Sequence, residues 1–132
     1  MRTLAGVDLA ALAQREGTPL YVYSTPAILA RARALRSALA GLDAGICYAV
    51  KANGNRALLA LLAGEGIGAD IVSGGELRRA LVAGIPADRI VFSGVGKSAG
   101  EIDAALQAGI ARFNLESRPE LVPLAIEWSW ES

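Results

Sequence analysis

Short apolar runs recur at a nearly constant interval through the chain, and segments with helical periodicity separate them. Four runs predict strands: residues 46–50, 70–72, 89–92 and 112–115. Three segments between them predict helices: residues 56–63, 75–83 and 99–108. The runs carry apolar residues on both sides rather than in strict alternation with polar ones, which is typical of strands that are covered on both faces. This order of strand and helix predicts βα units of a parallel sheet, and therefore an α/β fold.

Each predicted helix ends in an Ala-Gly pair, at Gly64, Gly84 and Gly109. Glycine after the last helical residue readily adopts the left-handed conformation that closes a helix. An isoleucine follows soon after each glycine, and we expect it to pack back on its helix.

The first part of the chain has a different pattern. Asp8 is a suitable cap for a helix over residues 9–16, which Gly17 would end. The sequence Leu-Tyr-Val-Tyr at residues 20–23 predicts a strand. Ser24, Thr25 and Pro26 then predict the start of a second helix, over residues 27–40.

A lysine directly follows the first apolar run, in the stretch Cys-Tyr-Ala-Val-Lys-Ala-Asn-Gly-Asn. Asn53 and Gly54 predict a turn, because both residues tolerate positive φ. Most lysines are solvated, so a lysine just beyond a strand end usually places its charge in water. In parallel α/β proteins, however, the carboxyl ends of the strands carry the active site, and this favours a functional interpretation of Lys51.

Composition narrows the classes of function. Thirteen basic and thirteen acidic residues cancel, so no net charge favours binding to nucleic acid or to a membrane surface. No apolar stretch approaches the roughly 20 residues needed to cross a bilayer. The single cysteine, Cys47, suits a reducing cytoplasm and is expected to be a small core residue. Without histidine the chain offers no histidine-based catalysis or zinc binding, and no metal site is expected.

Two glycine-containing segments could suggest phosphate binding. The segment from Gly94 to Ser98 resembles the end of a P-loop, but Val91 stands where that motif requires glycine. Residues 73–75, Ser-Gly-Gly, could cradle a phosphate at a helix start. Small residues after a strand more often simply form the turn.

Several motifs in unbroken order resemble the opening of diaminopimelate decarboxylases: GTPLYVYSTPAILARARAL, CYAVKANGN, ADIVSGGELRRALVAGIP, RIVFSGVGKSAGEI and RFNLESRPEL. These enzymes use pyridoxal 5'-phosphate and join a (β/α)8 barrel of the alanine-racemase-like type to a β-domain. The motif YAVKAN alone leaves open related decarboxylases of ornithine, arginine or carboxynorspermidine. Residues 17–23, with ANGN and SGGEL, favour diaminopimelate.

The resemblance implies roles for particular residues. Lys51 falls on the lysine that binds the cofactor covalently, and Ala49, two residues earlier, would flank the cofactor. Asp70 and Glu76 fall on acidic residues close to the cofactor. Three further residues are implied to line the barrel mouth without a chemical role: Ser93, Lys97 and Glu116.

The resemblance also implies a division of the chain. Residues 1–24 would contribute a helix and a strand to the β-domain. Residues 25–121 would form about the first four βα units of the cofactor-binding barrel, and residues 122–132 a divergent tail. A complete barrel needs about 250 residues, so we expect a truncated, frame-shifted or shortened enzyme that is inactive alone.

The whole enzyme is expected to be a cytoplasmic homodimer that decarboxylates an amino-acid substrate. A non-catalytic pyridoxal-phosphate-binding protein, which shares the barrel and the lysine, is the alternative outside enzymes. The predicted strand at residues 20–23 argues against it, because such proteins lack the β-domain.

Overall fold

A computed structural model of the chain describes residues 2–122 and residue 124. The chain divides after Ala40 into two compact units. We describe each unit by itself.

The amino-terminal unit begins with a small hairpin and a helix. Strands β1 (Thr3–Leu4) and β2 (Val7–Asp8) pair antiparallel, and α1 (Leu9–Glu16) follows at once. The Asp8 carboxylate accepts a hydrogen bond from the backbone N–H of Ala10 at 2.9 Å, which is the predicted cap. The bounds predicted for this helix are confirmed. The hairpin was not predicted, because strands of two residues carry almost no periodic pattern.

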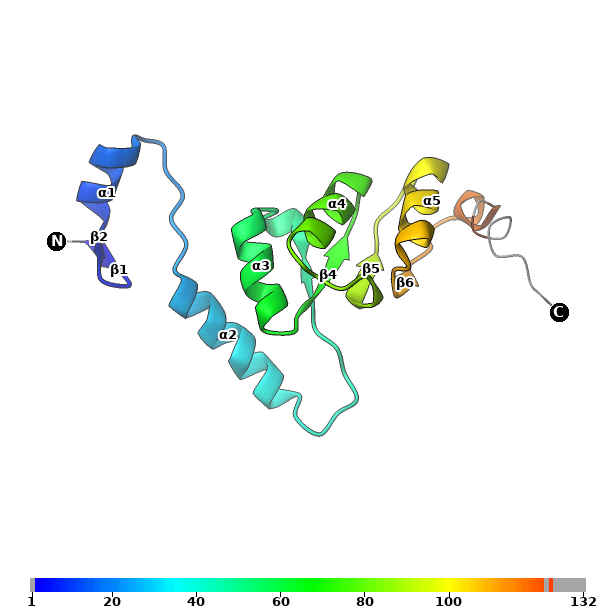
Figure 1. The fold of residues 1–132 in the computed structure, drawn as a ribbon, viewed down its shortest axis with the longest axis horizontal. Coiled ribbons are helices and arrows are strands. Elements are labelled where there is room, and N and C mark those ends of the chain that lie inside the picture. Colours follow the sequence, from blue (N-terminus) through cyan, green and yellow to red (C-terminus); the bar gives the residue numbers. More distant parts are fainter. Residues whose placement is uncertain (1, 123, 125–132) are drawn as a thin grey trace. The chain divides into compact units, whose positions relative to one another are not determined.

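The prediction of a strand at residues 20–23 is wrong for this structure. These residues have no regular secondary structure and run as an extended connection between α1 and the next helix (Figure 1). A strand needs a neighbouring strand to hydrogen-bond with, and the described residues provide none here. Tyr21 and Tyr23 are accordingly 85% and 58% exposed.

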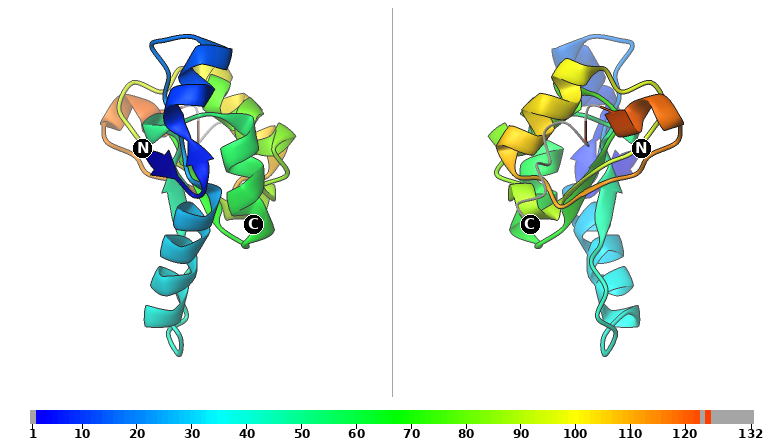
Figure 2. Two further views of the ribbon diagram at one scale, coloured as in Figure 1. Left: turned by 90° about the vertical axis from the view of Figure 1, so that its left-hand side faces the viewer. Right: turned by 90° about the vertical axis from the view of Figure 1, so that its right-hand side faces the viewer.

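Helix α2 (Thr25–Ala38) completes this unit and runs as one straight helix in both views of Figure 2. The Ser24 hydroxyl accepts a hydrogen bond from the N–H of Ala27 at 3.3 Å, and Pro26 lies in the first turn. The helix therefore starts two residues before the predicted position, because Ser24 acts as its cap.

The carboxy-terminal unit is built on a parallel sheet of four strands in the order β3-β4-β5-β6. The strands are β3 (Cys47–Ala49), β4 (Gly68–Ile71), β5 (Ile90–Phe92) and β6 (Arg112–Phe113). The helices are α3 (Arg56–Gly64), α4 (Gly74–Val82) and α5 (Ala99–Ala108), with 3-10 turns at Val50–Ala52, Ala87–Arg89 and Arg118–Glu120. Figure 1 shows the three helices lined up along the sheet. Sequential parallel strands with helical crossovers confirm the predicted α/β fold of a partial (β/α)8 barrel.

Strand β4 starts two residues earlier than the apolar pattern predicts, at Gly68. A β-carbon at this position would lie 2.1 Å from the carbonyl oxygen of Arg89, far inside contact distance. The first residue of β4 therefore has to be glycine, a residue that the strand pattern alone disfavours.

The helix ends follow the predicted chemistry with one difference. Gly84 and Gly109 have positive φ after α4 and α5, whereas α3 continues through Gly64 and the left-handed residue is Gly66. In each case the following isoleucine donates its N–H to a carbonyl in the last turn of the helix: Ile67 to Leu62, Ile85 to Ala80 and Ile110 to Ala105. Ile67 and Ile85 are buried, which confirms that they pack back on their helices.

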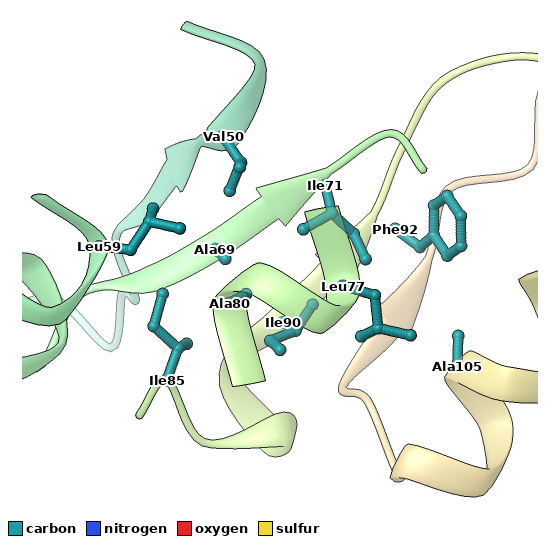
Figure 3. Packing of buried hydrophobic residues seen from close by; sticks show 10 residues of the cluster. All are labelled: Val50, Leu59, Ala69, Ile71, Leu77, Ala80, Ile85, Ile90, Phe92 and Ala105. Atoms are coloured by element: carbon teal, nitrogen blue, oxygen red, sulfur yellow. The ribbon is translucent and has the colours of Figure 1, made fainter. Parts of the chain in front are cut away.

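The hydrophobic core lies between the sheet and the three helices (Figure 3). Strands β4 and β5 contribute Ala69, Ile71, Ile90 and Phe92, which face side chains from the helices. The helix residues of this core are Leu59, Leu77, Ala80 and Ala105.

Within the carboxy-terminal unit, the described helices cover only one face of the sheet. Cys47 lies in edge strand β3 and is exposed, so the prediction that it is a core residue is wrong for this structure. The other face, which the helices of this unit do not cover, carries Asp70 and Arg112 beside Ala49 and Val91. None of the helices in the described part of the chain is long and apolar enough to span a bilayer.

Candidate functional site

The candidate site lies where the four parallel strands end. The carboxyl ends of parallel strands share one edge of the sheet, and there the loops after the strands meet. The sequence predicts Lys51, Asp70 and Glu76 near this edge, after or within the first two strands.

Lys51 lies in a tight turn rather than at the end of a strand. Strand β3 stops at Ala49, and Val50–Ala52 forms a 3-10 turn in which Val50 is 1% exposed and Lys51 is exposed. The buried Val50 side chain packs in the core and holds the backbone of this turn in place. The Lys51 side chain therefore extends from a fixed backbone. Because the strand ends at Ala49, strand alternation no longer places Ala49 and Lys51 on the same side.

Hydrogen bonds hold the segment that follows Lys51. The Tyr48 hydroxyl donates to the carbonyl oxygen of Asn53 at 3.5 Å, and the Asn53 side chain accepts from the N–H of Asn55 at 3.0 Å. Asn55 in turn caps α3 by accepting from the N–H of Ala57 at 2.9 Å. The Asn-Gly-Asn sequence thus forms both the turn and the helix cap.

Asp70 lies in the middle of a row of residues that crosses the sheet. The register pairs Ala49 with Asp70, Asp70 with Val91, and Val91 with Arg112, so all four occupy the same face. This face is opposite to the one on which Ala69 and Ile71 meet the helices. Among the described residues, the Oδ1 atom of Asp70 is buried and has no hydrogen-bond partner. A buried carboxylate oxygen without a donor is costly, and this one is therefore suited to a ligand that supplies the donor.

Glu76 lies in the first turn of α4, with its carboxylate bound to its own loop. Its Oε2 atom accepts from the N–H of Val72 at 2.8 Å, while its backbone N–H donates to the Ser73 hydroxyl at 3.2 Å. The Gly74 N–H of the same loop donates to Glu101 of α5 at 2.9 Å. Carboxylates thus already bind N–H groups of this loop, which weakens the interpretation of residues 73–75 as a phosphate cradle.

Lys97 does not line the mouth as an available amine, although the resemblance implies it. Its side chain is 1% exposed, and its Nζ atom donates to the carbonyl oxygens of Gly94 and Asn114, the latter at 2.7 Å. Nζ also donates to a carboxylate oxygen of Glu120 at 3.2 Å and lies 5.6 Å from the centre of the Phe92 ring. All three ammonium hydrogens therefore have an acceptor.

Glu120 lies in the 3-10 turn after β6 and binds Lys97, a position that the sequence did not predict. Its side chain is 4% exposed, and it accepts from the N–H of Gly96 at 2.9 Å and from that of Glu116 at 3.2 Å. The Glu116 N–H, followed by the Lys97 ammonium, lowers the pKa of this carboxyl below 4.5. The spacing of the two glutamates after the fourth strand was the available signal, but glutamates are usually solvated.

The two other residues implied at the mouth, Ser93 and Glu116, do lie in the loops that follow β5 and β6. The Ser93 hydroxyl accepts from the Asn114 side-chain amide at 3.0 Å, and Glu116 accepts from the N–H of Gly94 at 3.2 Å. The structure therefore brings residues 93–97 and 114–120 together.

Cys47 lies on the face of the sheet that carries Ala49 and Asp70. Its thiol donates to the carbonyl oxygen of Arg89 at 3.8 Å. Partial burial raises the pKa of this thiol, the Asp70 carboxylate raises it further, and the Arg112 guanidinium lowers it. Cys47, Asp70 and Arg112 are thus electrostatic neighbours.

Comparison with protein families matches residues 26–128 to the pyridoxal-binding domain of pyridoxal-dependent decarboxylases. The diaminopimelate decarboxylase of Zymomonas mobilis is 52% identical over 122 residues, covering 90% of this chain and 29% of that protein. The diaminopimelate decarboxylase of Aquifex aeolicus is 56% identical over 118 residues, with coverages of 89% and 28%. The chain therefore spans less than a third of the length of the curated relatives it matches.

Solved structures agree with this. The diaminopimelate decarboxylase of Helicobacter pylori, complexed with L-lysine, superposes with a TM-score of 0.85 at 46% identity, covering 90% of this chain and 30% of that one. The enzyme of M. jannaschii, in complex with L-lysine, gives 0.82 at 39% identity, with coverages of 92% and 30%. These findings confirm the predicted family and cofactor class. The chain belongs to the pyridoxal-dependent decarboxylases, through their pyridoxal-binding domain.

Proposed function

We propose that this chain is part of a diaminopimelate decarboxylase that converts meso-diaminopimelate to lysine with pyridoxal 5'-phosphate. The observation that carries the proposal is the identity of 50% or more to diaminopimelate decarboxylases from several bacteria. Since the chain spans less than a third of these relatives, it is proposed to be inactive alone.

The residues at the sheet edge fit such a cofactor. Lys51 is exposed on a fixed turn. Asp70, on the neighbouring strand β4, has a buried carboxylate oxygen that no hydrogen-bond donor among the described residues contacts. The other lysine, Lys97, has every ammonium hydrogen bonded to protein. When bound, pyridoxal phosphate supplies an electron sink for the electron pair that remains after the carboxylate leaves.

The chemistry of each proposed site residue suits a particular role in binding the cofactor. Lys51 attaches the cofactor covalently, which requires an amine that can lose its proton; arginine, which stays protonated, could not replace it. Ala49, with its small side chain, leaves room for the cofactor beside Asp70, its register partner. Asp70 and Glu76 place negative charge next to it.

The remaining proposals concern the whole enzyme. We place it in the cytoplasm as a homodimer that binds a small amino-acid substrate, without nucleic acid or membrane. The single cysteine supports the cytoplasm, the balanced charge supports the absence of nucleic-acid and membrane binding, and the L-lysine complexes of solved relatives support an amino-acid substrate. Residues 1–24 are proposed to belong to a β-domain, residues 25–121 to the barrel and residues 122–132 to a tail. The family match, which runs from residue 26 to residue 128, supports the first boundary.

The cofactor proposal is tested by two matched substitutions that each remove one amine and keep a positive charge. Lys51→Arg should abolish the absorbance of lysine-bound cofactor on titration with pyridoxal phosphate. Lys97→Arg should keep it, because a guanidinium can still bind Glu120 and the two carbonyls. Retention of the absorbance in Lys51→Arg would contradict the assignment.

The substrate proposal is tested separately, on the full-length enzyme. We expect kcat/KM for release of carbon dioxide to be higher with meso-diaminopimelate than with ornithine, arginine or carboxynorspermidine. A clear preference for ornithine would move the chain to the neighbouring group of decarboxylases. Cofactor binding without any decarboxylation would favour a non-catalytic pyridoxal-phosphate-binding protein.

A further inference from the structure

The loops after β5 and β6 are joined by a buried ion pair, Lys97 and Glu120, which we name the loop clasp. Both side chains are at most 4% exposed, and the lysine nitrogen lies 3.2 Å from the carboxylate oxygen. Lys97 belongs to the loop that follows β5, and Glu120 to the 3-10 turn Arg118–Glu120 after β6. The clasp therefore connects two segments that are far apart in sequence.

The hydrogen bonds of the clasp are complete. Lys97 donates to the carbonyl oxygens of Gly94 and Asn114 and to Glu120, one in its own loop and two in the other. Glu120 accepts from the N–H of Gly96 in the first loop and from that of Glu116 in the second. Each member of the pair thus binds both loops. Buried charges are tolerated in proteins when their partners are all present, and are strongly destabilising when one is removed.

Neighbouring loops are tied in a related way. Glu101 of α5 accepts from the N–H of Gly74, the first residue of α4, and Glu116 accepts from the N–H of Gly94 in the loop after β5. In both cases the carboxylate of a glutamate further along the chain accepts a hydrogen bond from a backbone N–H that follows the preceding strand. The clasp extends this arrangement and adds a buried cation to it.

We propose that Lys97 and Glu120 are positioning residues that hold the loops after β5 and β6 at the site edge and keep the Lys97 amine from reacting. Lys51 is then the only ε-amine of the chain that is free to react, since the sequence contains two lysines. The importance of this selectivity for the cofactor rests on the proposed function. The clasp itself does not, because it is formed entirely by protein groups.

The first test measures the reactivity of the two amines with a probe that is unrelated to the cofactor. The chain is acetylated with an N-hydroxysuccinimide ester, and the modified peptides are quantified against time. Lys97 should react at least about tenfold more slowly than Lys51, because its ammonium is buried and bonded to three acceptors. Equal rates would overturn the proposal, whether or not the chain binds pyridoxal phosphate.

The second test breaks the clasp and measures amide hydrogen exchange. Glu120→Gln and Lys97→Met should each speed exchange at residues 94–97 and 114–120 by about tenfold, while the amides of β4 stay protected. Lys97→Arg keeps the positive charge and should preserve the protection of both loops. If Lys97 only filled space, Lys97→Met would preserve the protection as well. Glu16→Gln, at an exposed ion pair with Arg15, is the matched control and should change neither loop.

A double variant distinguishes coupling from two separate effects. In Lys97→Met with Glu120→Gln, exchange should rise by less than the product of the single effects, because no buried charge is left unpaired. Multiplicative effects, unchanged exchange in both single variants, or equal loss of protection in β4 would each overturn the positioning role.

Discussion

The two lysines of this chain have opposite environments, although their sequence contexts are similar. Lys51 and Lys97 both follow an apolar strand and both stand near glycine. Lys51 is exposed in its turn, whereas Lys97 is buried against Glu120. The difference arises from acceptors that lie 17 and 23 residues further along the chain than Lys97. No local pattern could have indicated it.

Cys47 provides a test of the electrostatics around Asp70. Partial burial and the Asp70 carboxylate raise its pKa above the ordinary value of a thiol, so its thiolate is scarce at neutral pH. We expect slow alkylation by iodoacetamide at pH 7.5. Asp70→Asn should accelerate the reaction, and Arg112→Gln should slow it further, because the two charges act in opposite directions. Effects of the same sign would contradict the placement of these groups.

At the level of elements, the sequence was sufficient wherever local chemistry decides the structure. The bounds of α5 and α1 agree with the prediction, since Ser98, Asp8 and the closing glycines act within their own turns. The strand order follows from the βα repeat. The strand at residues 20–23 failed because pairing depends on a distant partner. The start of β4 and the burial of Glu120 depend on contacts across the fold, which periodicity does not contain.

Gly68 tests the packing of the sheet. Gly68→Ala should destabilise the chain by about 1–3 kcal/mol, because the new methyl group would meet the Arg89 carbonyl 2.1 Å away and the strands would have to shift. The measurement is the urea midpoint. Gly100→Ala in α5 is the control, with nothing within 4 Å of the added atom, and should be neutral or stabilising by up to about 1 kcal/mol. A smaller effect at Gly68 than at Gly100 would show that the strand pairing is misplaced.

The glutamates that hold the loops predict a dependence on pH. The pKa of Glu101 is lowered below 4.5, chiefly by the Gly74 N–H, and that of Glu120 chiefly by the Glu116 N–H. A lowered folded-state pKa contributes stability that is complete above 4.5 and is lost as the pH falls through the lowered value. Loop amide exchange, corrected for its intrinsic pH dependence, should therefore rise as the pH falls below 4.5 and through the lowered pKa values of the two glutamates. Glu101→Gln should flatten this rise in the loop after β4, and a pH-independent wild type would refute the assignment.

In the carboxy-terminal unit the parallel sheet has two outer strands, and the described helices of this unit pack on one of its faces. Strands β3 and β6 are the outer strands, and unpaired backbone groups at such edges promote association. Ala49 and Val91 add some apolar surface beside Asp70 and Arg112 on the face that the helices of this unit do not cover. We expect the 132-residue chain to self-associate and to bind pyridoxal phosphate weakly. Size-exclusion chromatography with light scattering measures this, and a monodisperse monomer that binds the cofactor in a saturable way would contradict it.

Lys51, and not Lys97, is proposed to be the residue that reacts with the cofactor. This is measured by incubating the full-length enzyme with pyridoxal phosphate, reducing it with borohydride and locating the pyridoxyl group by peptide mapping. We expect modification of the peptide that contains Lys51, with the Lys97 peptide unmodified while the protein is folded. A pyridoxyl group on Lys97, or equal modification of both lysines, would contradict this proposal.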